Sequence, residues 1–368
     1  MKYITEYRDK ELAKKLVADI AKEARPDRNY RLMEFCGGHT HVISRYGLEG
    51  ILPKNVRMIH GPGCPVCVMP IGRIDSAIEL ALEHGVILCT YADTMRVPAS
   101  KGLSLMKAKA QGGDIRMIYS AADCLDIARA NPDRNVVFFA IGFETTTPAT
   151  AVVLKQAKAE GLKNFFVFCN HVLTPPAMRH ILKNQEKVQI EGFVGPAHVS
   201  TIIGSEPYET FAKDYSKPVV IAGFEPLDML QSILMLIRQI NLGEAKVENE
   251  FTRAVRPEGN MKAIRMMEEV FALRDSFEWR GLGSVPKSAL KLSDAYSDFD
   301  AEKHFNLVYR SVPDNKACEC GAILRGEKQP SDCRAFGTVC TPESPIGSCM
   351  VSSEGACAAY FTYGRHKR

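Results

Sequence analysis

The sequence predicts an α/β fold with parallel sheets, and three observations favour it. Short apolar segments rich in Val, Ile and Phe alternate with helical segments between about residues 30 and 240. Buried strands separated by helices are typical of parallel βαβ units. These 210 or so residues suit two smaller α/β domains better than one eight-stranded sheet. From Ser284 onward the chain becomes irregular and rich in Pro, Gly and Cys, which indicates a small third domain.

The elements can be followed in order along the chain. A first helix is expected from Asp9 to Ala24, because Leu12, Leu16 and Ile20 recur at helical spacing and Pro26 ends the pattern. Eight strands are expected after it, at RLMEF, VRMIH, VILCTYA, IRMIY, NVVFFAIGF, FFVFCN, IEGFVG and PVVIAGF. The charged segment 241–261 reads as a crossing segment, and a helix should follow from Met261 to Arg274.

These elements suggest three domains. The first α/β domain is expected at residues 1–130, the second at 131–240, and a helical linker with the C-terminal domain at 241–368. A Gly-Phe-Glu sequence follows a strand in both NVVFFAIGFETTTPA and KPVVIAGFEPLDML. This is either an internal repeat or a chance likeness of two βα turns.

Composition excludes several classes of protein. The net charge of +4 is scattered among acidic residues, with no basic patch of the kind that binds nucleic acid. The N-terminus lacks the apolar segment of a signal peptide, and no apolar run approaches a membrane span. We therefore expect a cytosolic protein. In that reducing compartment, twelve cysteines indicate metal binding or redox chemistry rather than structural disulfides.

The first candidate site is the segment FCGGHTH, which follows a predicted strand. Cys36 precedes two glycines, which let the backbone approach a ligand closely. A cysteine near a helix N-terminus should have a lowered pKa, and Cys36, His39 and His41 are ligands suited to iron. The alternative is a small buried cysteine followed by helix-capping histidines.

The second candidate site is the CxxC pair Cys64 and Cys67 in GPGCPVCV. This spacing suits a dithiol–disulfide redox pair or half of a zinc site. Pro65 and Pro70 enclose the pair in a rigid turn, and only Cys36 and its histidines could complete a zinc site, so the redox interpretation is favoured. An inert structural pair is the third alternative.

The third candidate site lies between Cys318 and Cys357, where six cysteines occur on an irregular chain. Four thiolates of this kind can hold a [4Fe–4S] cluster, and the paired CxxC knuckles of a zinc ribbon are absent. The radical-SAM spacing CxxxCxxC is also absent, so the cluster would transfer electrons or organise structure. Spacing alone does not select four of the six.

Other residues have ordinary explanations. His171 and His198 follow predicted strands and could face a cleft, although each is more often a hydrogen-bonded loop histidine. Asp93 is expected to cap a helix. Three further cysteines lie in apolar contexts and should simply be buried: Cys89, Cys124 and Cys169.

Taken together, FCGGHTH, GPGCPVCV, IGFETT and CTPESPIGSCMVSSEGACAAY resemble the signature segments of the HypD family over residues 29–363. The resemblance implies two Rossmann-like α/β domains facing a cleft and a third domain with a [4Fe–4S] cluster. It also implies a role in [NiFe]-hydrogenase maturation. With the partner HypC, such a protein forms the scaffold on which iron acquires cyanide, delivered by HypE, and carbon monoxide. The Fe(CN)₂CO unit then passes towards the hydrogenase large subunit.

The same resemblance assigns roles to individual residues. Cys36 would hold the iron transiently together with a HypC cysteine, with His39 close by, and Cys64 and Cys67 would be the redox pair. The family's cluster spacing fits Cys318 rather than Cys320 as first ligand, and leaves Cys349 over. The remaining ligands would be Cys333, Cys340 and Cys357, and the cleft would be lined by Glu144, Thr145 and Thr146.

The expected protein is thus an assembly scaffold with thiol redox activity rather than a conventional turnover enzyme. One alternative is a stand-alone iron–sulfur thiol–disulfide reductase. Another is a non-catalytic binding module stabilised by zinc.

Overall fold

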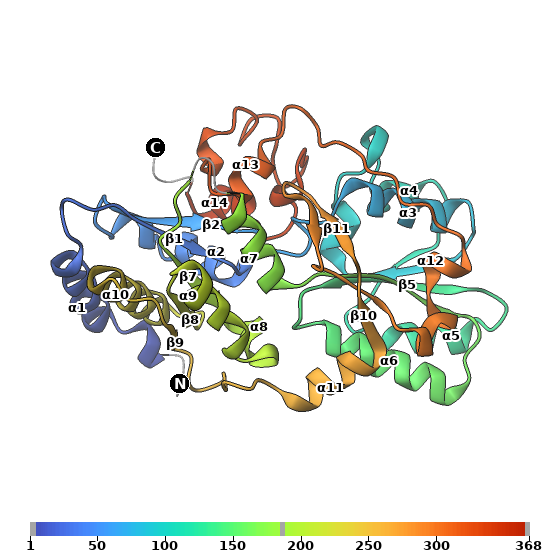
Figure 1. Ribbon diagram of the computed structural model, residues 1–368. Coiled ribbons are helices and arrows are strands. Elements are labelled where there is room, and N and C mark those ends of the chain that lie inside the picture. Colours follow the sequence, from blue (N-terminus) through green and yellow to red (C-terminus); the bar gives the residue numbers. More distant parts are fainter. Residues whose placement is uncertain (1–4, 185–187, 365–368) are drawn as a thin grey trace.

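The computed structural model describes residues 5–184 and 188–364 and has two parallel sheets flanked by helices (Figure 1). One sheet has five strands in the order β2-β1-β7-β8-β9, and the other has four in the order β4-β3-β5-β6. The five are β1 (Tyr30–Glu34), β2 (Val56–His60), β7 (Gly192–Pro196), β8 (Val219–Ala222) and β9 (Val247–Asn249). The four are β3 (Ile87–Thr90), β4 (Ile115–Met117), β5 (Val136–Gly142) and β6 (Phe165–His171). The expected α/β class and its eight strands are confirmed.

The helices pack around these sheets, and their ends agree with local sequence signals. The first helix lies where expected, with Asp9 and Ala24 as its capping residues. It begins at this point because the Asp9 carboxylate accepts the N–H groups of Glu11 and Leu12 at 2.8 and 2.9 Å. The helices of the two α/β units are α1 (Lys10–Glu23), α2 (Gly37–Arg45), α3 (Ile71–Leu82), α4 (Leu105–Ala110), α5 (Asp123–Ala130), α6 (Thr147–Glu160), α7 (Thr174–Lys183), α8 (Ala197–Ile203), α9 (Glu209–Tyr215) and α10 (Pro226–Leu242). No helix within the described ranges is long and apolar enough to cross a membrane.

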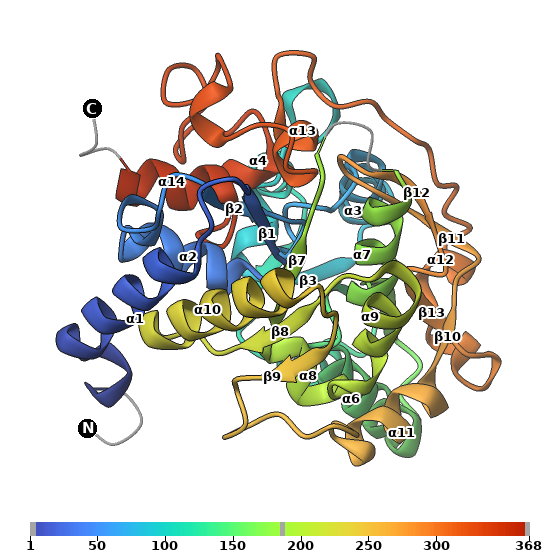
Figure 2. The same cartoon turned by 60° about the vertical axis from the view of Figure 1, so that its left-hand side comes forward.

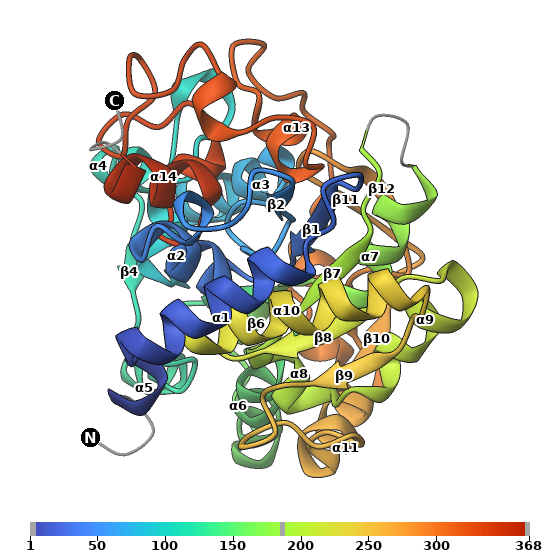
Figure 3. The same cartoon turned by 90° about the vertical axis from the view of Figure 1, so that its left-hand side faces the viewer.

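The two sheets divide the chain differently from boundaries at residues 130 and 240. Along the chain, β1 and β2 of the five-stranded sheet precede all strands of the four-stranded sheet, and β7, β8 and β9 follow them. Leu32 of β1 therefore lies opposite both Met58 of β2 and Gly192 of β7. The outer face of the five-stranded sheet is covered by α1 and α10, which lie side by side in Figures 2 and 3. Apolar patterning marks a buried strand but does not identify its partner, which explains why this crossover was not predicted.

The segment beyond residue 241 is more ordered than expected. The predicted crossing segment contributes β9, and the predicted helix ends early, as α11 (Met261–Val270), because the next three residues form a strand. Two antiparallel pairs follow: β10 (Phe271–Leu273) with β13 (Leu290–Leu292), and β11 (Ser276–Trp279) with β12 (Gly283–Pro286).

The last part of the described chain is irregular, with short helices α12 (Ala301–His304), α13 (Cys320–Leu324) and α14 (Ala356–Gly364). In Figure 1 the red part with α13 and α14 lies above the five-stranded unit, where α14 packs against α2, whereas α12 lies against β6 of the four-stranded unit. One apolar core joins β1, the CxxC turn and the C-terminal cysteines. The three cysteine segments therefore meet in one part of the molecule.

Candidate functional site

The turn that carries Cys36 is held by a buried carboxylate. Cys36 is the N-cap of α2, and its N–H donates to Glu34 Oε2 at 2.9 Å. The other oxygen of Glu34 accepts from the Thr40 hydroxyl and lies 2.8 Å from His60 Nδ1. Burial would lower the pKa of His60, but its bond to Glu34 raises it instead. Gly63 passes so close that a Cβ there would lie 2.3 Å from the Cys36 nitrogen, so the two predicted cysteine turns pack on each other.

The thiol of Cys36 is not activated in the way the sequence indicated. Burial raises its pKa well above the ordinary value, and the Glu354 carboxylate adds to the effect. The N–H groups of Gly38 and His39 act in the opposite direction but are outweighed. The expected lowering of the pKa at the helix N-terminus is therefore wrong, because desolvation exceeds it. Binding of a cation would deprotonate the thiol directly.

Cys36 opens into a cavity of about 520 Å³ in which both α/β units and the C-terminal region meet. Thr145 and Thr146, from the turn after β5, line the same cavity. Other walls come from His198 at the start of α8 and from Glu354 near the chain end. Cys36, Thr145 and Thr146 are thus brought together as the sequence indicated.

Two other predicted site residues lie outside this cavity. His39 is fully buried, with Nε2 3.0 Å from the Ala222 carbonyl oxygen and its ring against Phe224. Glu144 accepts the N–H of Thr174 at 2.8 Å and its hydroxyl at 3.0 Å, and burial raises the pKa of Glu144 to about 7. Neither side chain lines the cavity, although Thr145, next to Glu144 in the chain, does.

Two of the three residues for which the sequence suggested only ordinary roles line the cavity. Asp93 lines the cavity and makes no capping hydrogen bond, so its expected role as a helix cap is wrong. His198 lines it too, with its ring 4.1 Å from that of Phe224. His171 does not, because it is buried and its Nε2 lies 2.8 Å from Thr150 Oγ1. The position after a strand was the only signal that could have selected His198 and Asp93.

The CxxC thiols are connected to the C-terminal cysteines. Cys67 N–H donates to Cys64 Sγ at 3.2 Å, and the Cys67 thiol is hydrogen-bonded to Cys349. Burial raises the pKa of Cys67, whereas donation from Cys320 and Cys67 lowers the pKa of Cys349 to about 6. A continuous row of thiols therefore runs from Cys64 to Cys320. The sequence assigned no role to Cys320 and Cys349. The fold shows that these two cysteines lie between the CxxC pair and the other C-terminal cysteines.

Five C-terminal cysteines surround one small cavity. Cys320 is hydrogen-bonded to Cys318 and Cys357. Gly347 packs against these thiols, because a Cβ at this position would lie 2.3 Å from Cys318 Sγ and 2.5 Å from Cys320 Sγ. Only glycine permits this approach. The cysteines that line the cavity are Cys318, Cys320, Cys333, Cys340 and Cys357.

This set of donors fits a [4Fe–4S] cluster. Four thiolates are required, each bound to a different iron, and five are present. The cavity is only about 10 Å³, so the thiols would have to turn outward around a cluster. Within the described ranges, no three His, Cys, Asp or Glu side chains are grouped as ligands of a single metal ion. The geometry thus leaves the choice between Cys318 and Cys320 open.

The remaining cysteines are buried structural residues, as expected. Cys89 and Cys124 contact each other, and Cys169 Sγ donates to the Leu290 carbonyl oxygen at 3.3 Å.

The known proteins similar to this chain that are described below all carry the name HypD. A family model described as "HypD: Hydrogenase formation hypA family" matches residues 11–364. The chain is 65% identical to the hydrogenase maturation factor HypD of Cupriavidus necator, across 100% of this chain and 98% of that protein. It is 62% identical to HypD of Azotobacter vinelandii, with coverage of 100% and 98%. Identity to HypD of Escherichia coli K12 is 45%, with coverage of 99% and 98%.

Proposed function

Because the chain belongs to the HypD family of hydrogenase maturation factors, we propose that it is the scaffold on which the Fe(CN)₂CO unit of a [NiFe]-hydrogenase is assembled. The observation that carries this proposal is the position of Cys36 in a cavity bounded by three separate parts of the chain. Such a cavity can enclose an iron ion and its small ligands, while its open side admits a partner.

Cys36 supplies the anchoring ligand. Its buried thiol is protonated in the free protein and loses the proton when Fe(II) binds, so that metal binding and deprotonation are coupled. A soft thiolate suits low-spin iron that carries cyanide and carbon monoxide. Glu34 fixes the backbone of Cys36 and so orients the thiol.

The partners follow from the same role. HypC contributes a second cysteine ligand from the open side of the cavity, HypE delivers cyanide, and the completed unit passes towards the hydrogenase large subunit. These assignments rest on family membership and on the accessible cavity.

The row of thiols provides the redox function. Oxidation of Cys64 and Cys67 forms one disulfide and releases two electrons and two protons, and reduction reverses this. Cys349 lies in hydrogen-bonding contact with both Cys67 and Cys320, so it can relay thiol–disulfide exchange between them. A [4Fe–4S] cluster held by the C-terminal cysteines would supply single electrons.

The infrared spectrum of the anaerobically purified complex with HypC tests the proposal. Bands from metal-bound cyanide and carbon monoxide are expected with the wild-type chain and should disappear with Cys36→Ser. Their absence from a wild-type complex that contains iron would overturn the assembly role.

The thiol row also favours a second candidate function, a stand-alone iron–sulfur thiol–disulfide reductase. This alternative requires reduction of a small disulfide substrate without HypC. Turnover of such a substrate together with an infrared spectrum free of cyanide and carbonyl bands would favour it.

A further inference from the structure

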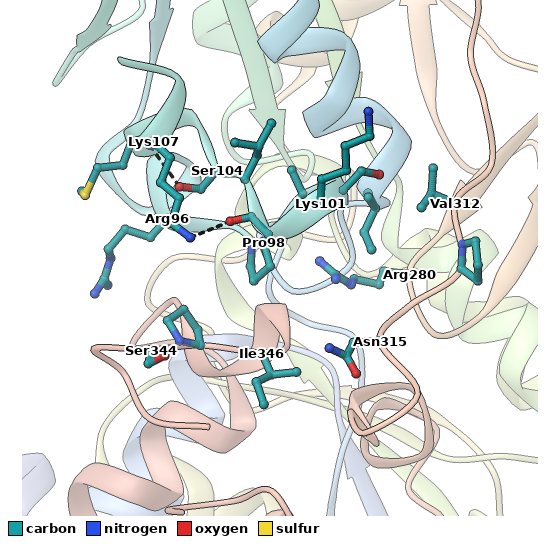
Figure 4. Close-up of a pocket in the computed structure, with 18 of the residues that line it drawn as sticks. Arg96, Pro98, Lys101, Ser104, Lys107, Arg280, Val312, Asn315, Ser344 and Ile346 are labelled. Atoms are coloured by element: carbon teal, nitrogen blue, oxygen red, sulfur yellow. Dashed lines mark hydrogen bonds between the residues drawn. The ribbon is translucent and has the colours of Figure 1, made fainter. Parts of the chain in front are cut away.

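A second large cavity, of about 590 Å³, lies apart from the one that contains Cys36 and shares no lining residue with it. One wall is formed by residues 96–107, which follow β3 and include the first turn of α4, and the other by residues 312–315 and 343–346 (Figure 4). Its volume is in the range of cavities that hold small molecules.

The lining of this cavity is cationic. Among the described residues that line it, four carry a positive charge and Glu343 is the one acid, so the formal charge of the lining is four minus one, or +3, and Asp314, which pairs with Arg280 beside the cavity, reduces it to +2. The four are Arg96, Lys101, Lys107 and Arg280. A concave surface of this charge attracts anions.

Arg280 places a buried hydrogen-bond donor without a partner in the wall of this cavity. The residue is only 4% exposed, and its guanidinium points towards the middle of the cavity in Figure 4. Its Nε donates to Asp314 at 2.5 Å, but its Nη1 is buried and has no hydrogen-bond partner. A buried N–H without an acceptor is costly, so this position favours a ligand that provides one.

Two further cations are already fixed near the cavity. Arg96 donates to the carbonyl oxygens of Pro342 and Val351 at 3.2 and 2.8 Å. Lys107 Nζ donates to the Gly102 carbonyl oxygen at 2.6 Å. Both charges are therefore held in place before any ligand arrives, which reduces the entropy lost on binding.

From these observations we propose that this cavity binds a small oxyanion of the phosphate type. The planar guanidinium of Arg280 matches the oxygens of a phosphate or carboxylate, and the fixed cations balance a charge of two or more. The site is distinct from the iron site of the proposed function and does not depend on it.

The site adjoins the C-terminal cysteines. The Ile346 N–H donates to Cys340 Sγ at 3.4 Å, and the Asn315 carbonyl oxygen accepts the Cys318 N–H at 2.8 Å. An anion bound between residues 96–107 and this chain would hold the two walls together. Binding should therefore also raise the melting temperature.

Calorimetric titration of the full-length anaerobic protein with inorganic phosphate, at constant ionic strength, tests the proposal. Saturable binding is expected in the wild type. Arg280→Gln should weaken it about tenfold or more, the loss expected for a charge-assisted hydrogen bond. A parallel titration with succinate, a dicarboxylate, compares the two classes of oxyanion. The ligand that binds more tightly shows whether the cavity is suited to phosphates or to carboxylates.

A matched pair of variants keeps the test decisive if Arg280→Gln does not fold. Lys107→Gln should weaken binding roughly threefold, as for a partly exposed charge. Lys109→Gln is the control, because Lys109 lies on the same helix but donates to the Ile115 carbonyl oxygen and does not line the cavity. Absence of saturable binding in the wild type, or equal weakening by the two lysine variants, would overturn the proposal.

Discussion

The carboxylate of Glu34 accepts the backbone N–H of Cys36 at 2.9 Å, although the two residues are only two positions apart in the chain. Glu34 is the last residue of β1 and is completely buried. Its second oxygen accepts from Thr40 in α2 and contacts His60 at the end of β2. One side chain therefore ties the thiol turn to the strand before it, the helix after it and the neighbouring strand.

Replacement of Glu34 by Gln should disturb this turn without removing any thiol. An amide oxygen cannot serve all three donors and the amide N–H₂ would face another donor, so we expect a loss of about 1–3 kcal/mol in unfolding free energy. Iron retained with HypC should also fall. Chemical denaturation and iron analysis measure both effects. Glu11→Gln, in an exposed ion pair with Lys14, is the control and should change neither by much.

Replacement of Cys36 by Ser should abolish retention of the iron unit and leave the fold and visible iron–sulfur absorption intact. The cavity keeps its shape, but the soft ligand is lost. Infrared bands and iron content of the complex with HypC provide the measurement. Cys169→Ser is a matched control, because a hydroxyl there can still donate to the Leu290 carbonyl oxygen. Unchanged cyanide and carbonyl bands in the Cys36 variant would contradict the assignment.

The sequence predicted individual strands well, but not which of them share a sheet. The apolar pattern of β1 identifies a buried strand, yet nothing local indicates that Leu32 pairs with Gly192, 160 positions away. Glu34 was overlooked for a similar reason, since a carboxylate at a strand end becomes informative only when its three donors are seen. The thiols illustrate the same limit. The family's spacing indicated four cluster ligands, but the place of Cys349 between two other cysteines depends on how the C-terminal region packs on the CxxC turn.

Replacement of Cys333, Cys340 or Cys357 by Ser should remove the visible iron–sulfur absorption and lower the melting temperature. The proposed cluster would cross-link a segment with little regular secondary structure, so its loss should destabilise this region. Iron content, absorption and thermal unfolding under anaerobic conditions provide the measurement. A variant that keeps four irons and its melting temperature would show that the replaced cysteine is not a ligand.

The same measurement chooses between two neighbouring cysteines. The family's cluster spacing favours Cys318 as the ligand, so Cys318→Ser should lose the cluster and Cys320→Ser should keep it. The opposite result would make Cys320 the ligand and exclude it from the thiol row that leads to Cys67.

Acid should weaken one buried ion-pair group in a defined range of pH. Burial opposes the charge of Glu302, but Arg73 (Nη1–Oε1 2.5 Å) and Arg274 together lower the pKa of Glu302 to about 2 from 4.5. The pKa is lower in the folded protein, so the stabilisation is present above pH ~4.5 and is lost as the pH falls towards ~2. Glu302→Gln should cost about 3 kcal/mol at pH 7, and this difference should shrink below pH ~4.5.

Denaturation curves of both proteins from pH 7 to pH 3 measure this difference. The control is Glu269→Gln, whose pair with Lys155 is exposed and should contribute little to stability. A difference that stays constant across the whole range would show that the charge of Glu302 does not stabilise the fold.

Cys64 and Cys67 should form a reversible disulfide in the folded protein. They are separated by two residues, and the Cys67 N–H already donates to Cys64 Sγ at 3.2 Å, so ring closure needs little backbone movement. Thiol trapping across a series of redox buffers should show two thiols that disappear together, with a single two-electron midpoint. Cys349→Ser should leave this disulfide able to form but slow its reduction, because Cys349 is the thiol in contact with Cys67.

A second pair of touching cysteines gives the control for that measurement. Cys89 and Cys124 also contact each other, but they lie in the four-stranded unit, away from the C-terminal cysteines. The double variant Cys89→Ser/Cys124→Ser should therefore leave the two-thiol signal and its midpoint unchanged. If Cys64 and Cys67 instead remain reduced in every oxidising buffer that preserves the fold, the redox role is wrong. These two thiols, buried beside the turn that carries Cys36, would then be better explained as metal ligands.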